Sequence, residues 1–204
     1  MKKPLTRIQK RNSDAILEAA LDVFSQNGFR GTTLDQIADV AGLSKPNLLY
    51  YFPSKDAVYT ALLARLLETW LDPLRAMNPK SDPMVEIMGY VRRKLQLSRD
   101  YPRESRLFAN EILQGAPHIR TAIEGDLRAL VDAKAAVLTH WMDQGLISPV
   151  HPVHLIFSIW ALTQHYADFD VQVRAVLGPG HDPFAEADVY LETLFSRLLT
   201  PHPD

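Results

Sequence analysis

Hydrophobic residues recur along most of this sequence three or four positions apart, with polar residues between them. That period places the apolar side chains on one face of an α-helix, and it is clearest near the N-terminus. The positions there are Ile16, Leu17, Ala20, Leu21 and Phe24. Nowhere does an apolar-polar alternation rich in Val, Ile and Thr run for about six residues, as a half-buried strand requires. The pattern predicts an all-α protein.

Turn residues and prolines divide this pattern into successive helices. The predicted helices span 13–27, 33–41, a short segment from 44, 54 to about 73, 84–101, 102–115, 117 to about 145, about 153–177 and 183–199. Asn12 or Ser13 would cap the first helix, which would end at Asn27-Gly28. Because the first three helices are short, we expect an N-terminal three-helix domain over residues 1–55 and a second helical domain over residues 56–204.

The second and third predicted helices meet at a tight turn that contains Gly42. Two short helices joined in this way form a helix-turn-helix, in which the second helix presents its N-terminal side chains to the major groove of DNA. Thr33 and Ser44 are suited to cap the two helices. Helical hairpins with a glycine turn also occur in proteins that never bind DNA, so a helical scaffold without DNA-binding activity is the alternative.

The formal net charge of −2 alone argues against a nucleic-acid partner, but the charge is unevenly distributed. Residues 1–56 hold eight Lys and Arg against six Asp and Glu, whereas the rest of the chain holds 14 against 18. Five cations precede the first acid, namely Lys2, Lys3, Arg7, Lys10 and Arg11. This segment is predicted to be a short basic arm that binds phosphate, with solubility of the terminus as the alternative.

The composition of the chain and the absence of known motifs argue against several other classes of protein. With 47% hydrophobic residues the chain should fold as a globular protein, and its lack of cysteine excludes disulfides and thiolate catalysis. No stretch reaches the ~18 apolar residues of a membrane span and the start lacks a signal peptide, so we predict a cytoplasmic protein. There is no Walker, GxGxxG, GxSxG or HExxH motif. Without these motifs we predict no enzyme activity and no cofactor. His151-x-x-His154 has no obvious third ligand, so we also predict no metal site.

Three groups of residues in and around the helix-turn-helix together form a more specific pattern. They are Thr33, the run Ile37-Ala38-x-x-Ala41-Gly42-Leu43-Ser44, and Tyr51-Phe52-x-Ser54-Lys55. This combination resembles the N-terminal signature of the TetR family of ligand-responsive transcriptional repressors. The resemblance implies a homodimer that binds a palindromic operator in double-stranded DNA and leaves it when a small molecule binds. Pro46 and Leu49 depart from the family's usual Gly and Tyr, which bears on base preference rather than on the fold.

The resemblance and the chemistry of the side chains together assign roles on DNA. Lys45 and Asn47, at the start of the second short helix, suit the base edges of guanine and adenine, and Pro46 shares their turn. The other predicted DNA contacts, mainly to phosphates, are Lys10, Arg11, Thr33, Ser44, Tyr50, Tyr51 and Lys55. For Tyr51 the alternative is an aromatic core residue.

Blocks beyond the DNA-binding region, among them Ser98 to Pro102 and His154 to Phe169, are similar to members of the family that respond to uracil and control pyrimidine use. Uracil and thymine are planar and alternate donors with acceptors, which calls for an aromatic ring and an amide. Trp70 and Gln164 are the predicted pair. The other predicted pocket residues are Leu74, Tyr101, Phe108, Glu111, Trp160, Thr163 and His165. A different small apolar or aromatic ligand is the alternative.

The last two predicted helices should supply the dimer surface. Residues 155–167 are apolar on nearly every face, as burial from two sides requires. The last helix carries a stripe made of Phe184, Ala187, Leu191, Leu194, Phe195 and Leu198. The family resemblance implies that these helices form a four-helix bundle across a two-fold axis, and the alternative is a core within one chain.

Overall fold

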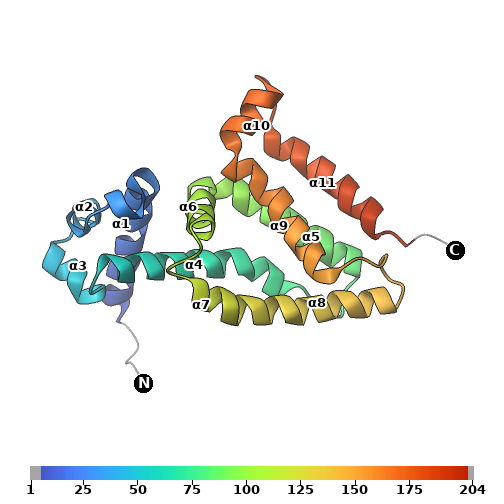
Figure 1. The fold of residues 1–204 in the computed structure, drawn as a ribbon, viewed down its shortest axis with the longest axis horizontal. Coiled ribbons are helices and arrows are strands. Elements are labelled where there is room, and N and C mark those ends of the chain that lie inside the picture. The colour runs from blue at the N-terminus through green and yellow to red at the C-terminus, as the bar shows by residue number, and fades with distance from the viewer. Residues whose placement is uncertain (1–5, 202–204) are drawn as a thin grey trace. The chain divides into compact units, whose positions relative to one another are not determined.

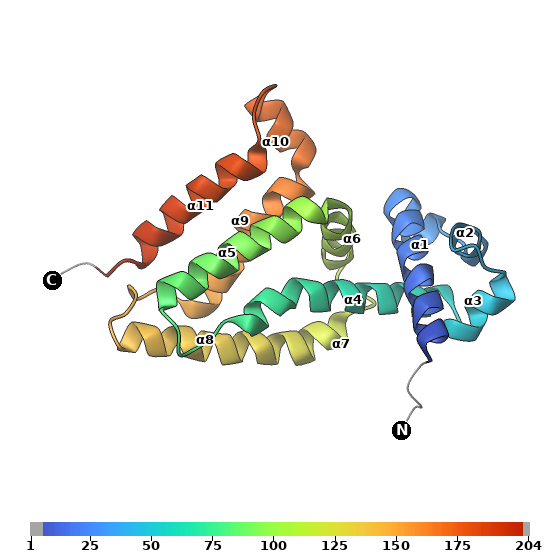
Figure 2. The same cartoon turned by 180° about the vertical axis from the view of Figure 1, so that it is seen from behind.

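The computed structural model describes residues 6–201, and this part of the chain consists of helices and connecting segments without a strand (Figures 1 and 2). The elements are α1 (Arg7–Gly31), α2 (Leu34–Val40), α3 (Lys45–Tyr51), α4 (Lys55–Ala76), α5 (Pro83–Asp100), α6 (Pro102–Leu113), α7 (Arg120–Ala122), the π-helical turn η1 (Ile123–Leu127), α8 (Arg128–Asp143), α9 (Pro152–Asp168), α10 (Asp170–Leu177) and α11 (Pro183–Leu199). The prediction of an all-α fold is confirmed.

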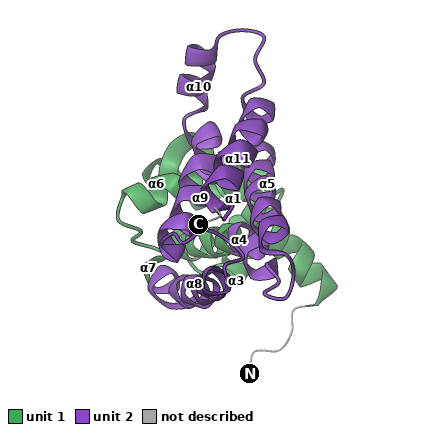
Figure 3. Ribbon diagram, turned by 90° about the vertical axis from the view of Figure 1, so that its right-hand side faces the viewer, with its two compact units in different colours: residues 1–67, 107–120 green, residues 68–106, 121–204 purple. Residues whose placement is uncertain are grey.

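The chain divides into two compact units (Figure 3). Unit 1 comprises residues 1–67 and 107–120, and unit 2 comprises residues 68–106 and 121–204. The first two divisions fall inside α4 and α6, so each of these helices contributes residues to both units. The predicted domain boundary between residues 55 and 56, at the start of α4, stays a prediction.

Unit 1 is built on α1, α2, α3, the first part of α4 and residues 107–120. Within it α1 contacts α2, and α2 contacts α3. The buried side chains of these helices include Ile16, Leu17, Ala20, Leu21, Phe24, Ile37, Leu48, Val58 and Leu62. Every apolar position that the sequence pattern assigns to the first helix is therefore in the core, as its spacing predicts.

The first helix begins earlier than its apolar pattern predicts. It starts at Arg7 because Thr6 forms a capping box with Gln9. The Thr6 hydroxyl accepts a hydrogen bond from the Gln9 backbone N at 3.2 Å, and Gln9 Oε1 accepts one from the Thr6 backbone N at 2.9 Å. The predicted caps at Asn12 and Ser13 were wrong, since a stronger capping signal lies upstream of the apolar stripe.

The early helix start also changes the predicted basic arm. Arg7, Lys10 and Arg11 lie on the first turns of α1 rather than on an extended segment, so the prediction of an arm was wrong for these three residues. All three are exposed, and their charges can still approach phosphates. Lys2 and Lys3 fall outside the described residues.

A break at Gly28 separates the last residues of α1 from the rest of the helix. Gly28 has φ +67° and ψ 174°, a conformation that is open almost only to glycine. The buried Thr32 hydroxyl donates a hydrogen bond to the Gly28 carbonyl at 2.8 Å. The predicted end of the helix at Asn27-Gly28 coincides with this break, although helical geometry resumes up to Gly31.

Replacing Gly28 with alanine should lower the free energy of unfolding by ~1–3 kcal/mol, because alanine does not tolerate this backbone conformation. Gly31→Ala is the matched control, since its new Cβ would make only an ordinary contact with Asn27 Cβ at 3.5 Å. Urea unfolding of the full chain compares the two variants. Equal stabilities would show that the break at Gly28 is not required for folding.

The fourth helix continues beyond its predicted end at Pro73. Proline removes one backbone donor from the helix, which costs stability. The residues that follow offset this cost, because Leu74 and Met77 are buried in the core of unit 2.

Two long predicted helices are interrupted in the structure. The helix predicted from residue 117 begins only at Arg120, after Ala116 with φ +55°, and it contains the π-helical turn η1. The helix predicted over about 153–177 breaks at Phe169, whose φ of −113° and ψ of 29° separate α9 from α10. The break at Phe169 involves no proline or glycine, which is why the sequence pattern missed it.

Unit 2 holds the larger core. In it α5 packs against α9 and α11, and α8 packs against α9. The core includes Leu74, Ile87, Val91, Leu138, Trp141, Ile156, Ile159, Leu191 and Phe195. Trp141 is 2% exposed, and its indole Nε1 donates a hydrogen bond to the Pro79 carbonyl at 3.2 Å. The long helices α5 and α9 thus form a rigid frame for any site between their side chains.

Candidate DNA-binding and ligand-binding sites

The turn between α2 and α3 has the geometry of a helix-turn-helix. Gly42 takes a left-handed conformation with φ +66°, and the Leu43 backbone N donates a hydrogen bond to the Ala38 carbonyl at 2.9 Å. Leu48 is fully buried and anchors α3 in the core of unit 1. The predicted helix-turn-helix is confirmed, and the N-terminal turn of α3 is exposed.

That exposed turn carries the residues predicted to read bases, Lys45, Pro46 and Asn47. Ser44 caps the helix, and its hydroxyl accepts a hydrogen bond from the Asn47 backbone N at 3.4 Å. Lys45 Nζ lies 2.8 Å from Asp35 Oδ2 in an ion pair that solvent reaches from both sides. Such an exposed pair contributes at most about 1 kcal/mol, so DNA can compete with Asp35 for the lysine.

Thr33 caps α2 through a second capping box, as its sequence position predicts. Its hydroxyl accepts a hydrogen bond from the Gln36 backbone N at 3.3 Å, and Gln36 Oε1 accepts one from the Thr33 backbone N at 2.8 Å. Thr33 is exposed, and its contact with phosphate stays a prediction.

Two tyrosines connect the end of α3 to the start of α1. Tyr50 is 71% exposed, and its hydroxyl accepts a hydrogen bond from Gln9 Nε2 at 3.2 Å. Tyr51 is half-buried, and its hydroxyl accepts one from Asn12 Nδ2 at 3.0 Å. The rings meet edge to face with centroids 5.2 Å apart. Each hydroxyl has one hydrogen bond, but the two rings differ in exposure. The exposed ring of Tyr50 can turn toward DNA, whereas the ring of Tyr51 is partly covered.

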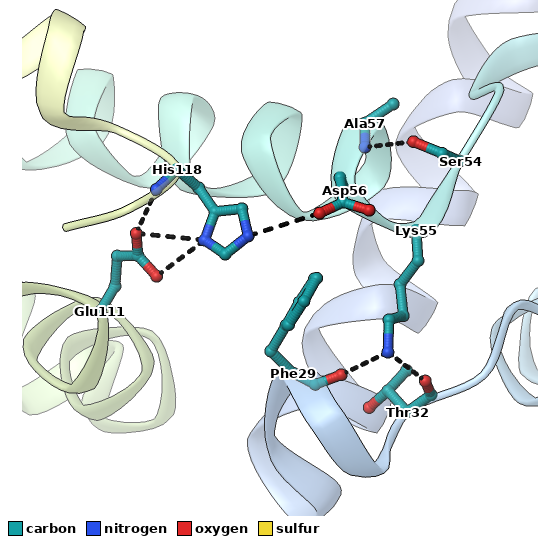
Figure 4. A network of polar contacts seen from close by, with 8 residues as sticks. All are labelled: Phe29, Thr32, Ser54, Lys55, Asp56, Ala57, Glu111 and His118. Atoms are coloured by element: carbon teal, nitrogen blue, oxygen red, sulfur yellow. Dashed lines mark hydrogen bonds and ion pairs between the residues drawn. The ribbon is translucent and has the colours of Figure 1, made fainter. Parts of the chain in front are cut away.

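Lys55, predicted to contact phosphate, is bound to the end of α1 (Figure 4). Its ammonium donates hydrogen bonds to the carbonyls of Phe29 at 2.7 Å and Thr32 at 2.9 Å. It also lies 4.5 Å from the centroid of the Phe29 ring. A cation at a helix C-terminus is favourable, so Lys55 holds α4 to α1, and a phosphate contact stays a prediction.

Glu111, predicted to line the ligand pocket, belongs to a network inside unit 1 (Figure 4). Its carboxylate is 3% exposed and accepts a hydrogen bond from the His118 backbone N at 2.7 Å. His118 Nδ1 lies 3.2 Å from Glu111 Oε2, and His118 Nε2 lies 3.6 Å from Asp56 Oδ1. Burial and the Glu111 charge raise the pKa of Tyr59 to about 12. Phe108 also belongs to unit 1, so neither residue lies in the unit of the other pocket candidates.

Trp70, one of the two principal ligand candidates, lies on α4 in unit 2 and is 5% exposed. Among the described residues its indole Nε1 has no hydrogen-bond partner although it is buried. Lys94 on α5 is 2% exposed, and its Nζ lies 4.5 Å from the centroid of the Trp70 ring. An aromatic plate, a free donor and a buried cation therefore meet at one place.

Gln164, the other principal candidate, lies half-buried on α9. One turn before it, Trp160 Nε1 donates a hydrogen bond to the Tyr90 hydroxyl at 2.5 Å. Thr163 is fully buried, and its hydroxyl donates to the Ile159 carbonyl at 2.6 Å. Trp160 and Thr163 thus have polar partners within unit 2, and their contact with a ligand stays a prediction.

The remaining pocket candidates of unit 2 lie in different environments. Leu74 is fully buried in the core. Tyr101, at the C-terminus of α5, is 44% exposed and lines an open groove with charged residues such as Asp72 and Arg93. His165 is exposed and stacks on Phe169 with ring centroids 5.1 Å apart. The structure therefore does not gather all predicted pocket residues around one point.

The histidine pair considered as a metal site begins α9. The His151 side chain accepts a hydrogen bond from the His154 backbone N at 3.4 Å, and the two rings lie 4.5 Å apart. Within residues 6–201, no three His, Cys, Asp or Glu side chains are grouped so that they could hold a metal ion. None of the helices in that range is both long and apolar enough to cross a membrane.

Comparison with known proteins decides the family. The family described as "Bacterial regulatory proteins, tetR family" matches residues 16–62, and "YcdC-like protein, C-terminal region" matches residues 63–202. The chain is 54% identical to the HTH-type transcriptional regulator RutR of Escherichia coli K12 over 173 residues, 85% of this chain and 82% of RutR. This chain belongs to the TetR family. As a TetR regulator it is a ligand-responsive, DNA-binding repressor whose partners are operator DNA, an effector and a second copy of the chain.

Other proteins are similar to this chain over a part of its length or in fold. IcaR, the negative transcriptional regulator of the biofilm operon icaADBC of Staphylococcus aureus Newman, is 44% identical over 46 residues, 22% of this chain and 25% of IcaR. The transcriptional regulator SCO4942 from Streptomyces coelicolor shares the fold with a TM-score of 0.74, at 23% identity and with 93% of this chain and 98% of that one covered. AibR, solved in complex with isovaleryl coenzyme A and operator DNA, has a TM-score of 0.69 at 20% identity, with 94% and 100% covered.

The helices predicted to form the dimer surface of this TetR protein bury most of their apolar stripe within unit 2. Phe184, Ala187, Leu191 and Phe195 of α11 are core residues, so for them the alternative of a core within one chain is correct. The exposed large apolar side chains of α9 and α11 are Phe157, Val189, Tyr190 and Leu198. We propose these exposed residues as the dimer contacts.

Several residues of these sites were not predicted. Gln9 and Asn12 hold the tyrosines of α3, and His118 holds Glu111. No local pattern marks these contacts, because each partner is distant in sequence or lies in a turn. Lys94 did carry a signal, since it occupies a position on the apolar stripe of α5, between Tyr90 and Ser98 at four-residue spacing. A lysine at a core position marks either a paired charge or a site.

Proposed function

We propose that the effector of this TetR regulator is uracil or thymine, and that its binding releases a palindromic operator that controls pyrimidine use. The proposal is supported by 54% identity to RutR over 173 residues and by the blocks that resemble uracil-responsive members of the family. In this proposal the chain acts by binding alone, without catalysis. It acts in the cytoplasm, where the operator DNA of a bacterium lies.

The observation that carries the ligand assignment is the buried, unpartnered indole Nε1 of Trp70. A buried N–H without an acceptor costs about 1–3 kcal/mol, and native proteins rarely leave one unused. A pyrimidinedione offers carbonyl oxygens that accept and ring N–H groups that donate. It can therefore satisfy Trp70 Nε1 and pair with the carboxamide of Gln164, which both accepts and donates.

For the DNA side, we propose that residues 1–55 bind the operator and that residues 56–204 hold the effector and the dimer contacts. Lys45 and Asn47 read base edges, with Pro46 starting their helix. The proposed phosphate contacts are Lys10, Arg11, Thr33, Ser44, Tyr50, Tyr51 and Lys55. Lys45 must exchange Asp35 for a base, which is a small cost for an exposed ion pair.

The effector acts by favouring one of two conformations of the dimer. A ligand shifts such an equilibrium only by the difference in its affinity for the two states. Couplings of about 1–3 kcal/mol are typical and lower the affinity for the other ligand about 5- to 150-fold. We expect uracil or thymine to lower operator affinity within this range, measured by fluorescence anisotropy on a labelled operator. Indifference to both bases would end the assignment of the effector and leave family membership untouched.

Gln164→Ala should abolish most of this response. The carboxamide is half-buried on α9, so its loss leaves the ring edge of the bound base without a partner. Gln172→Ala on α10 is the matched control, because that glutamine is exposed and lies outside the proposed site. The comparison is the uracil concentration that releases half of the operator. A full response in the Gln164 variant would remove this residue from the site.

A further inference from the structure

Lys94 is an unusual residue for the interior of a small domain. It lies on α5 with only 2% of its surface exposed, and within residues 6–201 it makes no ion pair with a carboxylate. Its ammonium faces the ring of Trp70 at 4.5 Å, and the nearest opposing charge that acts on it is Asp168 at the end of α9. A buried cation without close hydrogen-bonded partners is costly, and burial lowers the pKa of Lys94 to about 7.

A second donor lies at the same place. It is the indole Nε1 of Trp70, whose ring faces the Lys94 ammonium, and this buried N–H has no hydrogen-bond partner among the described residues. Two independent donors, an ammonium and an indole N–H, therefore lack acceptors within a few ångströms of each other. An acceptor supplied from outside the chain would satisfy both.

The pairing of α5 with α9 brings Gln164 to the same level. These helices pack side by side (Figures 1 and 2). Tyr90 of α5 is hydrogen-bonded to Trp160 of α9. One turn after Tyr90 lies Lys94, and two turns after Trp160 lies Asp168, which attracts the Lys94 charge. Residues four apart share a helix face, so Gln164 lies on the face of α9 that meets α5, between those two contacts.

The carboxylate that attracts Lys94 already has a hydrogen-bond partner. Asp168 Oδ1 accepts a hydrogen bond from the Ser105 hydroxyl at 2.6 Å, and Arg106 donates one to the Ala167 carbonyl at 3.3 Å. Burial raises the pKa of Asp168. Asp168 therefore supplies a distant counter-charge and leaves the ammonium of Lys94 open to a ligand.

We infer that Lys94 and Trp70 Nε1 form a donor site that binds a carbonyl oxygen of the effector, and that the effector belongs to the class of planar imides. This inference rests on the proposed function, because it assumes that unit 2 holds a small planar ligand. It adds a residue that the resemblance did not supply and a rule of selectivity. A carbonyl oxygen can accept hydrogen bonds from both Lys94 and Trp70 Nε1, and the bonds are stronger when the oxygen carries partial negative charge. An amino group would place its own N–H donors against these two donors, so the site should reject it.

The test compares wild type with Lys94→Met, Trp70→Phe and the control Lys80→Met, whose lysine is exposed in unit 2. Isothermal titration with uracil gives the affinity, and circular dichroism checks folding of the full chain. Lys94→Met should weaken uracil binding at least tenfold and Trp70→Phe about fivefold or more, with no change for Lys80→Met. Cytosine, which presents an amino group in place of one carbonyl, should bind wild type at least tenfold more weakly than uracil.

A second readout separates ligand contact from a structural effect. The indole N–H resonance of Trp70 should shift when uracil is added to ¹⁵N-labelled wild type, because the free N–H acquires an acceptor. If wild type binds uracil and Lys94→Met binds it equally well, the inference is overturned and the proposed function stands. If wild type binds neither uracil nor thymine, both are overturned. An unmoved Trp70 resonance on saturation would also overturn the donor site.

Discussion

Alanine in place of Lys45 should weaken operator binding by about 30-fold to about 10⁴-fold. A specific contact to a guanine edge contributes ~1–3 kcal/mol, and a two-fold symmetric dimer loses the contact in both half-sites. The loss is therefore ~2–6 kcal/mol, at ~1.4 kcal/mol for each factor of ten. The ion pair between Lys45 and Asp35 in the free protein changes this loss little, because both of its side chains are exposed to solvent.

Anisotropy titrations on the operator and on an unrelated duplex of equal length would test this. Asp35→Asn is the matched control, since it removes the ion pair but keeps the Lys45 charge, and we expect its operator affinity to equal or exceed that of wild type. An equal loss for Lys45→Ala on both duplexes would show that Lys45 contacts phosphate instead of bases. A fall for Asp35→Asn as large as that for Lys45→Ala would assign the effect to the ion pair.

Replacing Lys94 with methionine should stabilise the protein by several kcal/mol at neutral pH and below. Burial lowers the pKa of Lys94 from 10.5 to about 7, so the unfolded chain holds a proton there that the folded chain releases. Stability of wild type therefore rises as pH increases from about 7 to 10.5, and the full penalty applies below 7. At ~1.4 kcal/mol for each pKa unit the penalty is on the order of 5 kcal/mol. This penalty already includes the attraction of Asp168 on α9, which opposes the effect of burial.

Urea unfolding at pH 7 and pH 9 measures this effect in wild type, Lys94→Met and the exposed control Lys80→Met. The difference between wild type and Lys94→Met should shrink as pH rises, because methionine has no proton to lose and fills a similar volume. Lys80→Met should follow wild type at both values. A difference that is constant with pH would indicate that repacking, not the charge, separates the two proteins.

The sequence predicted the helical class, the helix-turn-helix and its caps because these depend on local signals. Thr33 and Ser44 cap α2 and α3 in the structure, and Gly42 takes the left-handed turn that its position requires. The start of α1 also has a local signal, the Thr6 and Gln9 capping box, but this signal precedes the apolar stripe from which the helix start is predicted.

The contacts of the candidate sites could not be predicted in the same way. Lys55 bonds to the Phe29 carbonyl 26 residues earlier, and Trp160 bonds to Tyr90 at a separation of 70. The packing of whole helices decides which residues so far apart in sequence become partners. A single sequence does not show which helix faces pack together. Glu111 is one of the predicted pocket residues, whereas in the structure its carboxylate accepts a hydrogen bond from the His118 backbone N.

The assignment of residues 107–120 to unit 1 matters for engineering chimeric regulators. A DNA-binding head defined by the family match alone would end near residue 62. In this protein such a cut leaves behind His118, whose ring lies 4.6 Å from Phe29 and 4.9 Å from Tyr59. A transplanted head would keep its native packing only if its new host carried this second, discontinuous piece as well.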